Sequence, residues 1–148
     1  MSTLYLIRGI SGSGKTTLAR AIFRGEQATD MMAADDYFYE EGEYRFNPSD
    51  LPRAHAWCLE EARSTLEEGA CAIVHNTFTQ RWEMEPYIKL ADEMGARLVV
   101  VSTYDGGCTD EELAERNSHG VPLEAIKSMR ARWEMDWKSG NPVPPWMR

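Results

Sequence analysis

The chain contains few of the residues that build disulfides, zinc sites or membrane spans. Its 148 residues include only three cysteines and three histidines. Both types are widely scattered, which excludes a disulfide framework or a zinc-binding pattern and leads us to expect a reduced, cytoplasmic protein. No stretch approaches the ~18 consecutive apolar residues of a membrane-spanning helix, so we expect no membrane partner. The first residues also lack the basic and apolar regions of a signal peptide.

Positive charge is scarce as well. The sequence has 16 lysines and arginines against 24 aspartates and glutamates, for a net charge of −8. A protein that coats long nucleic acids neutralises many phosphates with lysine and arginine, so this balance disfavours that class. The acidic balance is compatible with a small substrate or with binding to the end of a nucleic-acid strand. Apolar residues make up 43% and no low-complexity run occurs, which predicts a single folded domain over residues 1–148.

Against these absences stands one complete phosphate-binding motif. Gly9 to Thr16 read Gly-Ile-Ser-Gly-Ser-Gly-Lys-Thr, which matches G-x-x-x-x-G-K-[ST]. Residues 4–7 before it form an apolar run that fits a buried strand, and residues 17–24 after it fit a helix. A strand, a glycine loop and a helix N-terminus together form an anion cradle, whereas a chance glycine-rich turn would lack this context.

Each residue type in this phosphate loop suits a task in binding a nucleotide. Glycines permit backbone angles that a side chain would forbid, and their N–H groups can converge on phosphate oxygens. Lys15 can bring a flexible charge to the β- and γ-phosphates, and the Thr16 hydroxyl is a hard oxygen ligand suited to Mg²⁺. We therefore expect a nucleoside triphosphate and Mg²⁺. The expected nucleotide-binding residues are Ser11, Gly12, Ser13, Gly14, Lys15, Thr16 and Thr17.

The rest of the chain alternates between apolar runs and amphipathic segments. Strands are predicted at 30–34, 70–74 and 97–101, and helices at 49–68, 79–94, 109–117 and from Pro122 onward. We interpret the tyrosine-rich segment 37–48 as a loop and the tail from about 139 as irregular. This alternation predicts a three-layer α/β sandwich with a parallel sheet of about four to five strands.

Polar residues follow two of the predicted strands. The carboxyl ends of parallel strands share one edge of a sheet, which should bring Asp35, Asp36 and the segment 75–77 close to the phosphate loop. A carboxylate beside the γ-phosphate can take the proton of an acceptor hydroxyl, and a second can hold Mg²⁺ through water. The residues alone leave open which aspartate is the base. The alternative interpretation is that Asp35 and Asp36 are both turn residues that face solvent and take no part in the chemistry.

A polar turn late in the chain is a candidate lid. The segment near 109–121 contains Arg116, which could close over the nucleotide and stabilise charge on the moving phosphoryl group. The alternative is a surface turn with a cation at a helix C-terminus. For Arg130 and Arg132, on the following helix, we expect a solvated face, although one of them could face the site.

Taken in order, these motifs resemble the kinase domain of phage-type polynucleotide 5′-kinases and related AAA-type, kinase-like P-loop domains. The resemblance covers nearly the whole chain and is carried by residues 9–17, 34–38, 44–48, 76–77, 82–87 and 115–118. It implies a P-loop kinase fold and transfer of the γ-phosphoryl group of ATP, with Mg²⁺, to a 5′-hydroxyl end. It also implies that Lys15 and Thr16 hold phosphate and metal, Asp35 is the general base and Arg116 is the lid arginine. Asp36 is then the second candidate metal ligand, beside Thr16.

Three positions depart from the pattern of that family. Phe38 stands where the phage kinases carry an arginine that grips substrate phosphate, and His119 stands where their lid has a second arginine. His75 lies near a strand end where many P-loop kinases place an aspartate, and a neutral imidazole cannot replace a carboxylate near Mg²⁺. The first two departures, Phe38 and His119, weaken an assignment to acceptors that carry a 3′-phosphate.

Aromatic residues gather between positions 37 and 57, and their role is open. Such rings can stack a terminal base without reading its sequence, or they can pack the loop onto the next helix. The set is Tyr37, Phe38, Tyr39, Tyr44, Phe46 and Trp57. Three functions therefore compete: a kinase for a nucleic-acid 5′ end, a kinase for a small hydroxyl-bearing nucleoside, nucleotide or metabolite, and a non-catalytic ATP-binding module. The preference for DNA or RNA and the oligomeric state stay open.

Overall fold

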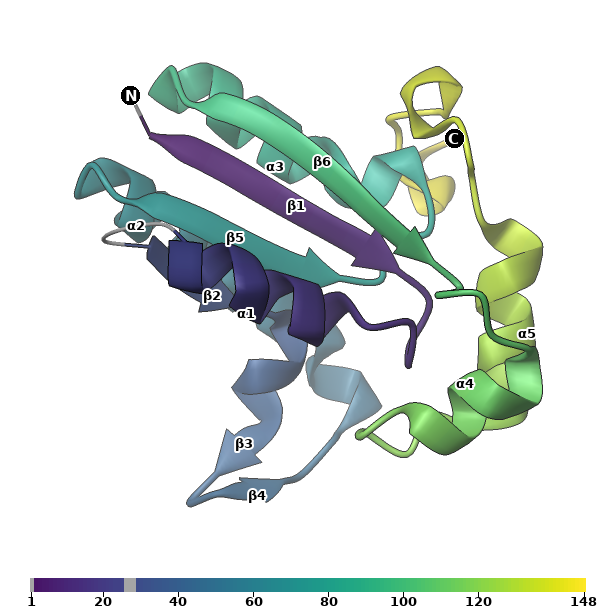
Figure 1. Ribbon diagram of the computed structural model, residues 1–148. Helices are drawn as coiled ribbons and strands as arrows, with labels where there is room; N and C mark the ends of the chain where they lie inside the picture. Colours follow the sequence, from purple (N-terminus) through teal and green to yellow (C-terminus); the bar gives the residue numbers. More distant parts are fainter. Residues whose placement is uncertain (1, 26–28) are drawn as a thin grey trace.

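The fold is built on a parallel sheet whose strand ends converge on one edge. The computed structural model describes residues 2–25 and 29–148. Its four-stranded sheet has the order β2–β5–β1–β6 (Figure 1), formed by β1 (Thr3–Gly9), β2 (Thr29–Met32), β5 (Cys71–Asn76) and β6 (Arg97–Tyr104). All neighbouring pairs are parallel, which confirms the predicted sheet. β5 and β6 extend past the predicted ends, and β2 stops two residues earlier.

Helices cover both faces of this sheet. Helix α1 (Lys15–Gly25) lies on one face, and α2 (Leu51–Glu67) and α3 (Arg81–Met94) lie on the other (Figure 1). The three-layer α/β sandwich is therefore confirmed. Two further helices, α4 (Asp110–Arg116) and α5 (Leu123–Arg132), lie beyond the carboxyl ends of the strands. No helix in the described ranges combines the length and apolarity needed to cross a bilayer.

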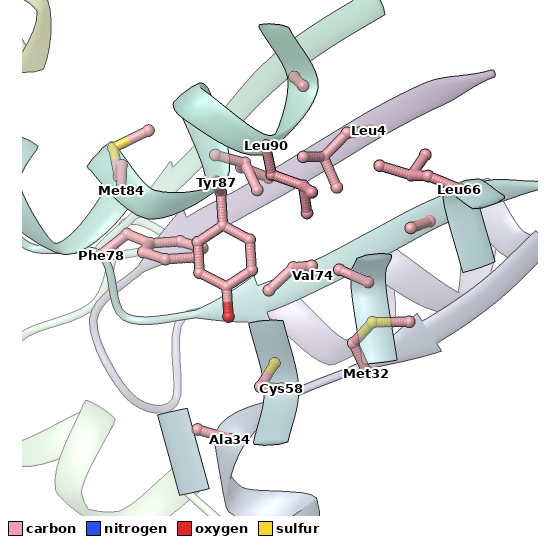
Figure 2. Packing of buried hydrophobic residues seen from close by; sticks show 14 of the residues in the cluster. Leu4, Met32, Ala34, Cys58, Leu66, Val74, Phe78, Met84, Tyr87 and Leu90 are labelled. Atoms are coloured by element: carbon pink, nitrogen blue, oxygen red, sulfur yellow. The ribbon is translucent and has the colours of Figure 1, made fainter. Parts of the chain in front are cut away.

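The hydrophobic core follows the two faces of the sheet. Successive side chains of a strand point to opposite faces. On β1, Leu4 and Leu6 join the main cluster beneath α2 and α3, whereas Ile7 packs with Ala19 of α1 on the other face. Figure 2 shows the main cluster, in which Tyr87 and Leu90 of α3 lie against Leu4 and Val74. Because both faces are covered, the central residues of β1, β5 and β6 are apolar on both sides of the sheet.

A separate cluster joins the phosphate loop to the end of the chain. Ile10, which belongs to the loop itself, is fully buried with Leu113 of α4 and Ile126 of α5. Cys108 completes the buried set, and Met129 and Trp133 pack against it. The segment beyond β6 is thus anchored to the phosphate loop by apolar contacts.

The segment 37–48 is not the loop that we predicted. A 3-10 helix, η1 (Ala34–Phe38), leads into a hairpin of two short strands, β3 (Tyr39–Glu40) and β4 (Glu43–Tyr44). Glu41 and Gly42 both have positive φ, at 50° and 83°, as a tight two-residue hairpin turn requires. The hairpin projects away from the four-stranded sheet, toward the bottom of the view in Figure 1.

Some predicted helix ends shift by one or two residues. Helix α3 begins at Arg81 with Gln80 as its N-cap, whereas we expected Thr79 to open it. The helix ends at Met94, as predicted, and Gly95 is its C-cap in the left-handed conformation. Pro122 is the N-cap of α5 and not its first residue. In the tail, 3-10 turns occur at η3 (Trp137–Ser139) and η4 (Pro145–Met147).

Candidate functional site

The phosphate loop is held between the ends of two neighbouring strands. β1 ends at Gly9, and α1 begins at Lys15. The Gly9 N–H donates to the carbonyl of Thr77, which follows β5, at 3.1 Å, and the Ile10 N–H donates to the carbonyl of Tyr104 in β6 at 2.8 Å. The loop therefore lies at the carboxyl edge of the sheet, where the strand pattern predicted it.

The loop has the backbone shape of an anion cradle. Gly12 and Gly14 adopt φ of 86° and 100°, which favour glycine because a Cβ would be strained there. The hydroxyls of Ser13 and Thr103 are 2.7 Å apart, which ties the loop to β6. Because α1 starts directly after Gly14, its N-terminal N–H groups face the same place, and the loop fits a phosphate group.

Lys15 lies folded over its own loop. Its Nζ donates to the carbonyl of Ile10 at 3.2 Å. Burial lowers the pKa of Lys15 to about 8, and the nearby Asp35 carboxylate opposes this by raising it. Thr16 and Thr17 are exposed on the first turn of α1, so the Thr16 hydroxyl is accessible to a metal ion.

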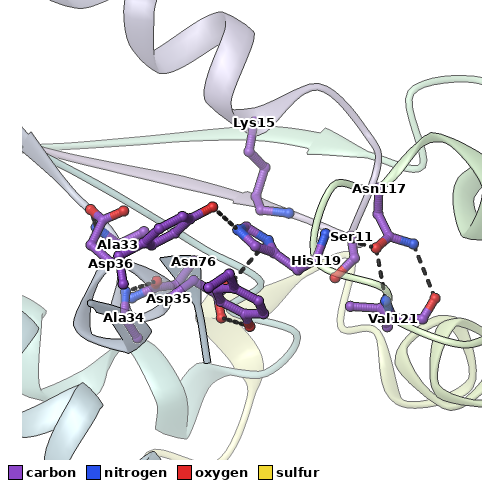
Figure 3. Close-up of polar contacts among 12 residues, drawn as sticks. Ser11, Lys15, Ala33, Ala34, Asp35, Asp36, Asn76, Asn117, His119 and Val121 are labelled. Atoms are coloured by element: carbon purple, nitrogen blue, oxygen red, sulfur yellow. Dashed lines mark hydrogen bonds and ion pairs between the residues drawn. The ribbon is translucent and has the colours of Figure 1, made fainter. Parts of the chain in front are cut away.

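The two adjacent aspartates make different contacts. Asp36 accepts the Ala33 N–H on Oδ2 at 3.0 Å and so caps η1. Asp35 accepts the Tyr44 hydroxyl on Oδ1 at 3.1 Å, and its Oδ2 lies 3.4 Å from Nδ1 of His119. Figure 3 shows His119 reaching from the turn after α4 toward Asp35. The hairpin and the late turn thus meet at Asp35, with 43% of that side chain exposed.

The end of β5 supports this arrangement. Asn76 is buried, and its Oδ1 accepts the Ala34 N–H at 2.9 Å, which fixes the start of η1 (Figure 3). His75 points to the opposite face of the strand and is also buried. Burial is the main reason that the pKa of His75 lies below its usual value, so the ring is neutral at pH 7. Asn76 therefore holds the aspartate segment in place.

The turn after α4 is shaped by one side chain. Asn117 donates from Nδ2 to the carbonyls of Leu113, Ala114 and Val121 at 2.9–3.3 Å. Its Oδ1 accepts the N–H groups of His119 at 3.2 Å and Val121 at 2.8 Å. The side chains of Thr109 and Glu112 form a capping box at the start of α4.

Arginines near this turn hold the segment together. The exposed Arg116 donates from Nη1 to the Cys108 sulfur at 2.8 Å. Arg130 donates to Asp110 at 2.7 Å and to Asp105 at 2.8 Å, and it holds the pKa of Asp105 below its usual range. Arg132 donates to the Thr79 hydroxyl at 3.0 Å. The expectation of a solvated face was wrong for Arg130, whose partly buried side chain joins α5 to the segment around Asp105 and Asp110, whereas Arg132 is exposed as expected.

The aromatic set divides into packed and accessible rings. Phe38 is only 3% exposed and belongs to the main core cluster, with its ring centroid 5.1 Å from that of Phe46 and 5.6 Å from that of Tyr37. Tyr37, Tyr39 and Phe46 are 37–49% exposed. Packing therefore explains Phe38, whereas the other three present ring surface to solvent.

Sequence reasoning missed several members of the site and its support. Tyr44 was considered only as an aromatic ring and His119 only as a replaced arginine, yet both contact Asp35. Arg8 is 1% exposed in β1, donates to the carbonyls of Phe78 and Thr79, and lies 4.0 Å from the Trp133 ring centroid. Burial lowers the pKa of Arg8 to about 10. In the sequence, the only sign of this role is that Arg8 directly follows the apolar run of residues 4–7.

The sequence matches a known family over most of its length. Residues 4–135 match the AAA domain family AAA_33. Human NEDD4-binding protein 2 is 35% identical over 133 residues, which cover 88% of this chain and 8% of that protein. The chain thus spans less than a tenth of the length of this relative.

Solved structures share the fold. A chain of the Pnkp1/Rnl/Hen1 RNA repair complex matches with a TM-score of 0.71 and 20% identity, over 88% of this chain and 43% of that one. A gluconokinase from Sinorhizobium meliloti 1021 matches with a TM-score of 0.57 and 19% identity, over 89% of this chain and 75% of that one. At these identities the likeness shows the fold alone.

Proposed function

The chain belongs to this AAA-domain family and has a P-loop kinase-like fold, and from that premise we propose that it transfers the γ-phosphoryl group of ATP to a hydroxyl acceptor. The observation that carries the proposal is the position of Asp35. Its carboxylate is partly exposed and close enough to Lys15 of the phosphate loop for its charge to oppose the lowering of that lysine's pKa by burial. A base next to the phosphate-binding lysine suits the deprotonation of an attacking hydroxyl.

On the nucleotide side, the chain supplies backbone and charge. The N–H groups of the phosphate loop would bind phosphate oxygens, and Lys15 would exchange the Ile10 carbonyl for an anionic partner. Thr16 and Asp36 are our candidates to hold Mg²⁺, directly or through water. When bound, Mg²⁺ neutralises charge that develops on the phosphates.

On the acceptor side, Asp35 would take the proton of the hydroxyl as the oxygen approaches the γ-phosphorus. Arg116 is our candidate to stabilise the equatorial oxygens of the moving group. Its guanidinium contacts the Cys108 sulfur in this structure and would have to turn toward the phosphate loop. The segment 109–121 would then act as the lid of the site.

We favour the 5′-hydroxyl of an oligonucleotide or polynucleotide as the acceptor. The supporting observation is that Tyr37, Tyr39 and Phe46 expose ring surface on η1 and on the hairpin segment beside Asp35. Base stacking on such rings is sequence-tolerant and contributes about 1–3 kcal/mol per base. The fold shared with a chain of an RNA repair complex is consistent with this choice.

A small acceptor without a phosphate group, such as a nucleoside or a metabolite, is the second candidate, and a specific observation supports it. Phe38 is buried in the core, so the position that would grip a substrate phosphate offers no charge. Glu40, Glu41 and Glu43 on the hairpin are exposed, and they would repel a phosphate-rich acceptor. The gluconokinase that shares the fold acts on a small molecule by its name.

Labelled ATP would decide between these acceptors. The protein would be incubated with γ-labelled ATP, Mg²⁺ and a panel of 5′-hydroxyl DNA and RNA oligonucleotides, nucleosides and gluconate. The same oligonucleotides bearing a 5′-phosphate are the matched control. Label on 5′-hydroxyl oligonucleotides alone would support the first candidate, and label on small molecules alone would support the second. Label on no acceptor, with ATP still bound, would contradict transfer and favour a non-catalytic ATP-binding module.

A further inference from the structure

The late turn delivers a histidine to the carboxylate that we assign as the base. His119 and Asp35 lie far apart in the sequence, yet Nδ1 and Oδ2 are 3.4 Å apart (Figure 3). The other ring nitrogen, Nε2, lies 3.5 Å from the Tyr39 hydroxyl, and the ring centroid is 4.7 Å from that of Tyr44. The imidazole therefore has a contact on each side, and only 26% of the side chain is exposed.

The backbone that carries His119 is held in place independently of the ring. The Asn117 side chain makes hydrogen bonds with backbone groups on both sides of the turn, including the His119 N–H. Leu113, one turn earlier, is fully buried in the cluster that contains Ile10 of the phosphate loop. The position of the imidazole is thus tied to the phosphate loop through packed residues.

Asp35 needs such a contact because nothing on its own element orients its carboxylate. The terminal torsion of an aspartate is broad, so a half-exposed carboxylate rotates unless partners hold it. Here Tyr44 engages Oδ1 and His119 engages Oδ2, and the two partners come from the hairpin and the late turn. Together they fix the plane of the carboxylate.

We propose that His119 is a positioning residue for phosphoryl transfer, which orients Asp35 by donating from Nδ1 to Oδ2. This inference rests on the proposed function, since it assigns Asp35 as the base. A base must lie within hydrogen-bond reach of the proton that it accepts, and small misplacements of reacting groups cost up to about 100-fold in rate. The lid segment and the base are therefore joined by one side chain.

Kinetics with variants of the turn test this role. With a 5′-hydroxyl oligonucleotide as the acceptor, His119→Ala should lower kcat by about 10- to 100-fold and leave KM for ATP nearly unchanged. His119→Asn, which keeps an N–H donor near the Nδ1 position, should recover much of that loss. Ser118→Ala, an exposed neighbour in the same turn, is the matched control and should retain full activity. Equal activity of His119→Ala and the native protein, or no recovery by asparagine, would overturn the inference.

A second measurement needs no activity. The ring-nitrogen NMR signals of His119 can be identified by their loss in His119→Asn, because the chain has only three histidines. Asp35→Asn should shift these signals, whereas Glu43→Gln, which removes a carboxylate from the neighbouring hairpin, should leave them in place. Unchanged signals in Asp35→Asn would overturn the contact itself. If the native protein labels no acceptor, that result alone contradicts the proposed function. The NMR comparison still decides whether His119 contacts Asp35.

Discussion

The carbonyl oxygen of Leu113 lies only 2.5 Å from the point that a Cβ on Gly12 would occupy. Helix α4 therefore packs directly on the backbone of the phosphate loop. The buried cluster of Ile10, Leu113 and Ile126 lies at the same contact. The segment that we propose as the lid packs on the nucleotide-binding loop, so changes in either element should affect the other.

Substitution of Gly12 tests this contact. Gly12→Ala should destabilise the protein by about 2–4 kcal/mol, because the methyl group meets a backbone carbonyl and the residue has positive φ. Gly14→Ala is the matched control: its φ is also positive, but apart from its neighbours in the chain no described residue has a heavy atom within 4 Å of the added Cβ, so about 1–2 kcal/mol is expected. Urea denaturation of the ligand-free proteins measures both. Equal losses would show that Leu113 does not press on Gly12 in solution.

The lowered pKa of Lys15 should appear as a pH dependence of stability. The pKa is about 8 in the folded protein against an ordinary value of 10.5, so the unfolded chain binds this proton more strongly between those values. The contribution of Lys15 to stability therefore rises as pH increases from 8 to 10.5. The free energy of unfolding of the native protein minus that of Lys15→Met should grow from pH 8 to pH 9.5. A constant difference across that range would contradict the assigned pKa.

Phe38 should prove to be a core residue that cannot be exchanged for the arginine of the phage-type kinases. Phe38→Arg places a charge without a partner in the main cluster and should cost about 3–5 kcal/mol. Tyr37→Arg, on the same 3-10 helix but 37% exposed, should change stability by less than about 1 kcal/mol. Chemical denaturation compares the two. A stable Phe38→Arg protein that gains affinity for a 3′-phosphorylated oligonucleotide would contradict this account.

Arg130 should matter for stability because of its partners on the segment between β6 and α4. It donates to the Asp105 and Asp110 carboxylates and to the Cys108 carbonyl. Arg130→Met should cost about 1–3 kcal/mol, and Arg130→Lys should restore only part of this, since an ammonium group cannot reproduce the planar fork. Lys127→Met on the exposed side of α5 is the control and should cost under ~0.5 kcal/mol. A similar loss in both methionine variants would contradict a structural role for Arg130.

Much of the fold could be predicted because its signals are local. The phosphate loop is contiguous, and each strand of the four-stranded sheet contains an apolar run. Where the predictions ended too early, the strands continue with polar residues that serve the site: Thr103 near the end of β6 contacts Ser13, and Asn76 at the end of β5 holds η1. Hydrophobic patterns do not report such residues as strand. The hairpin was missed because each of its strands is two residues long and depends on contacts between aromatic rings.

The contacts of Asp35 could not be predicted from spacing. Tyr44 reaches it from the hairpin, and His119 reaches it from a turn more than eighty residues later. Both contacts depend on how the hairpin and the late turn pack at the carboxyl edge of the sheet. The same holds for Arg8, whose partners Phe78 and Thr79 follow β5 and lie seventy residues away. Sequence motifs predicted which residues carry the chemistry, whereas the fold determines their partners.

The central claim is that Asp35 activates a hydroxyl next to a bound nucleotide. Its most direct test measures single-turnover transfer of label from γ-labelled ATP to the acceptor found in the panel, together with ATP binding, for the native protein and Asp35→Asn. The account predicts that Asp35→Asn binds ATP normally and transfers label at least about 100-fold more slowly. Transfer by Asp35→Asn at the native rate would contradict it.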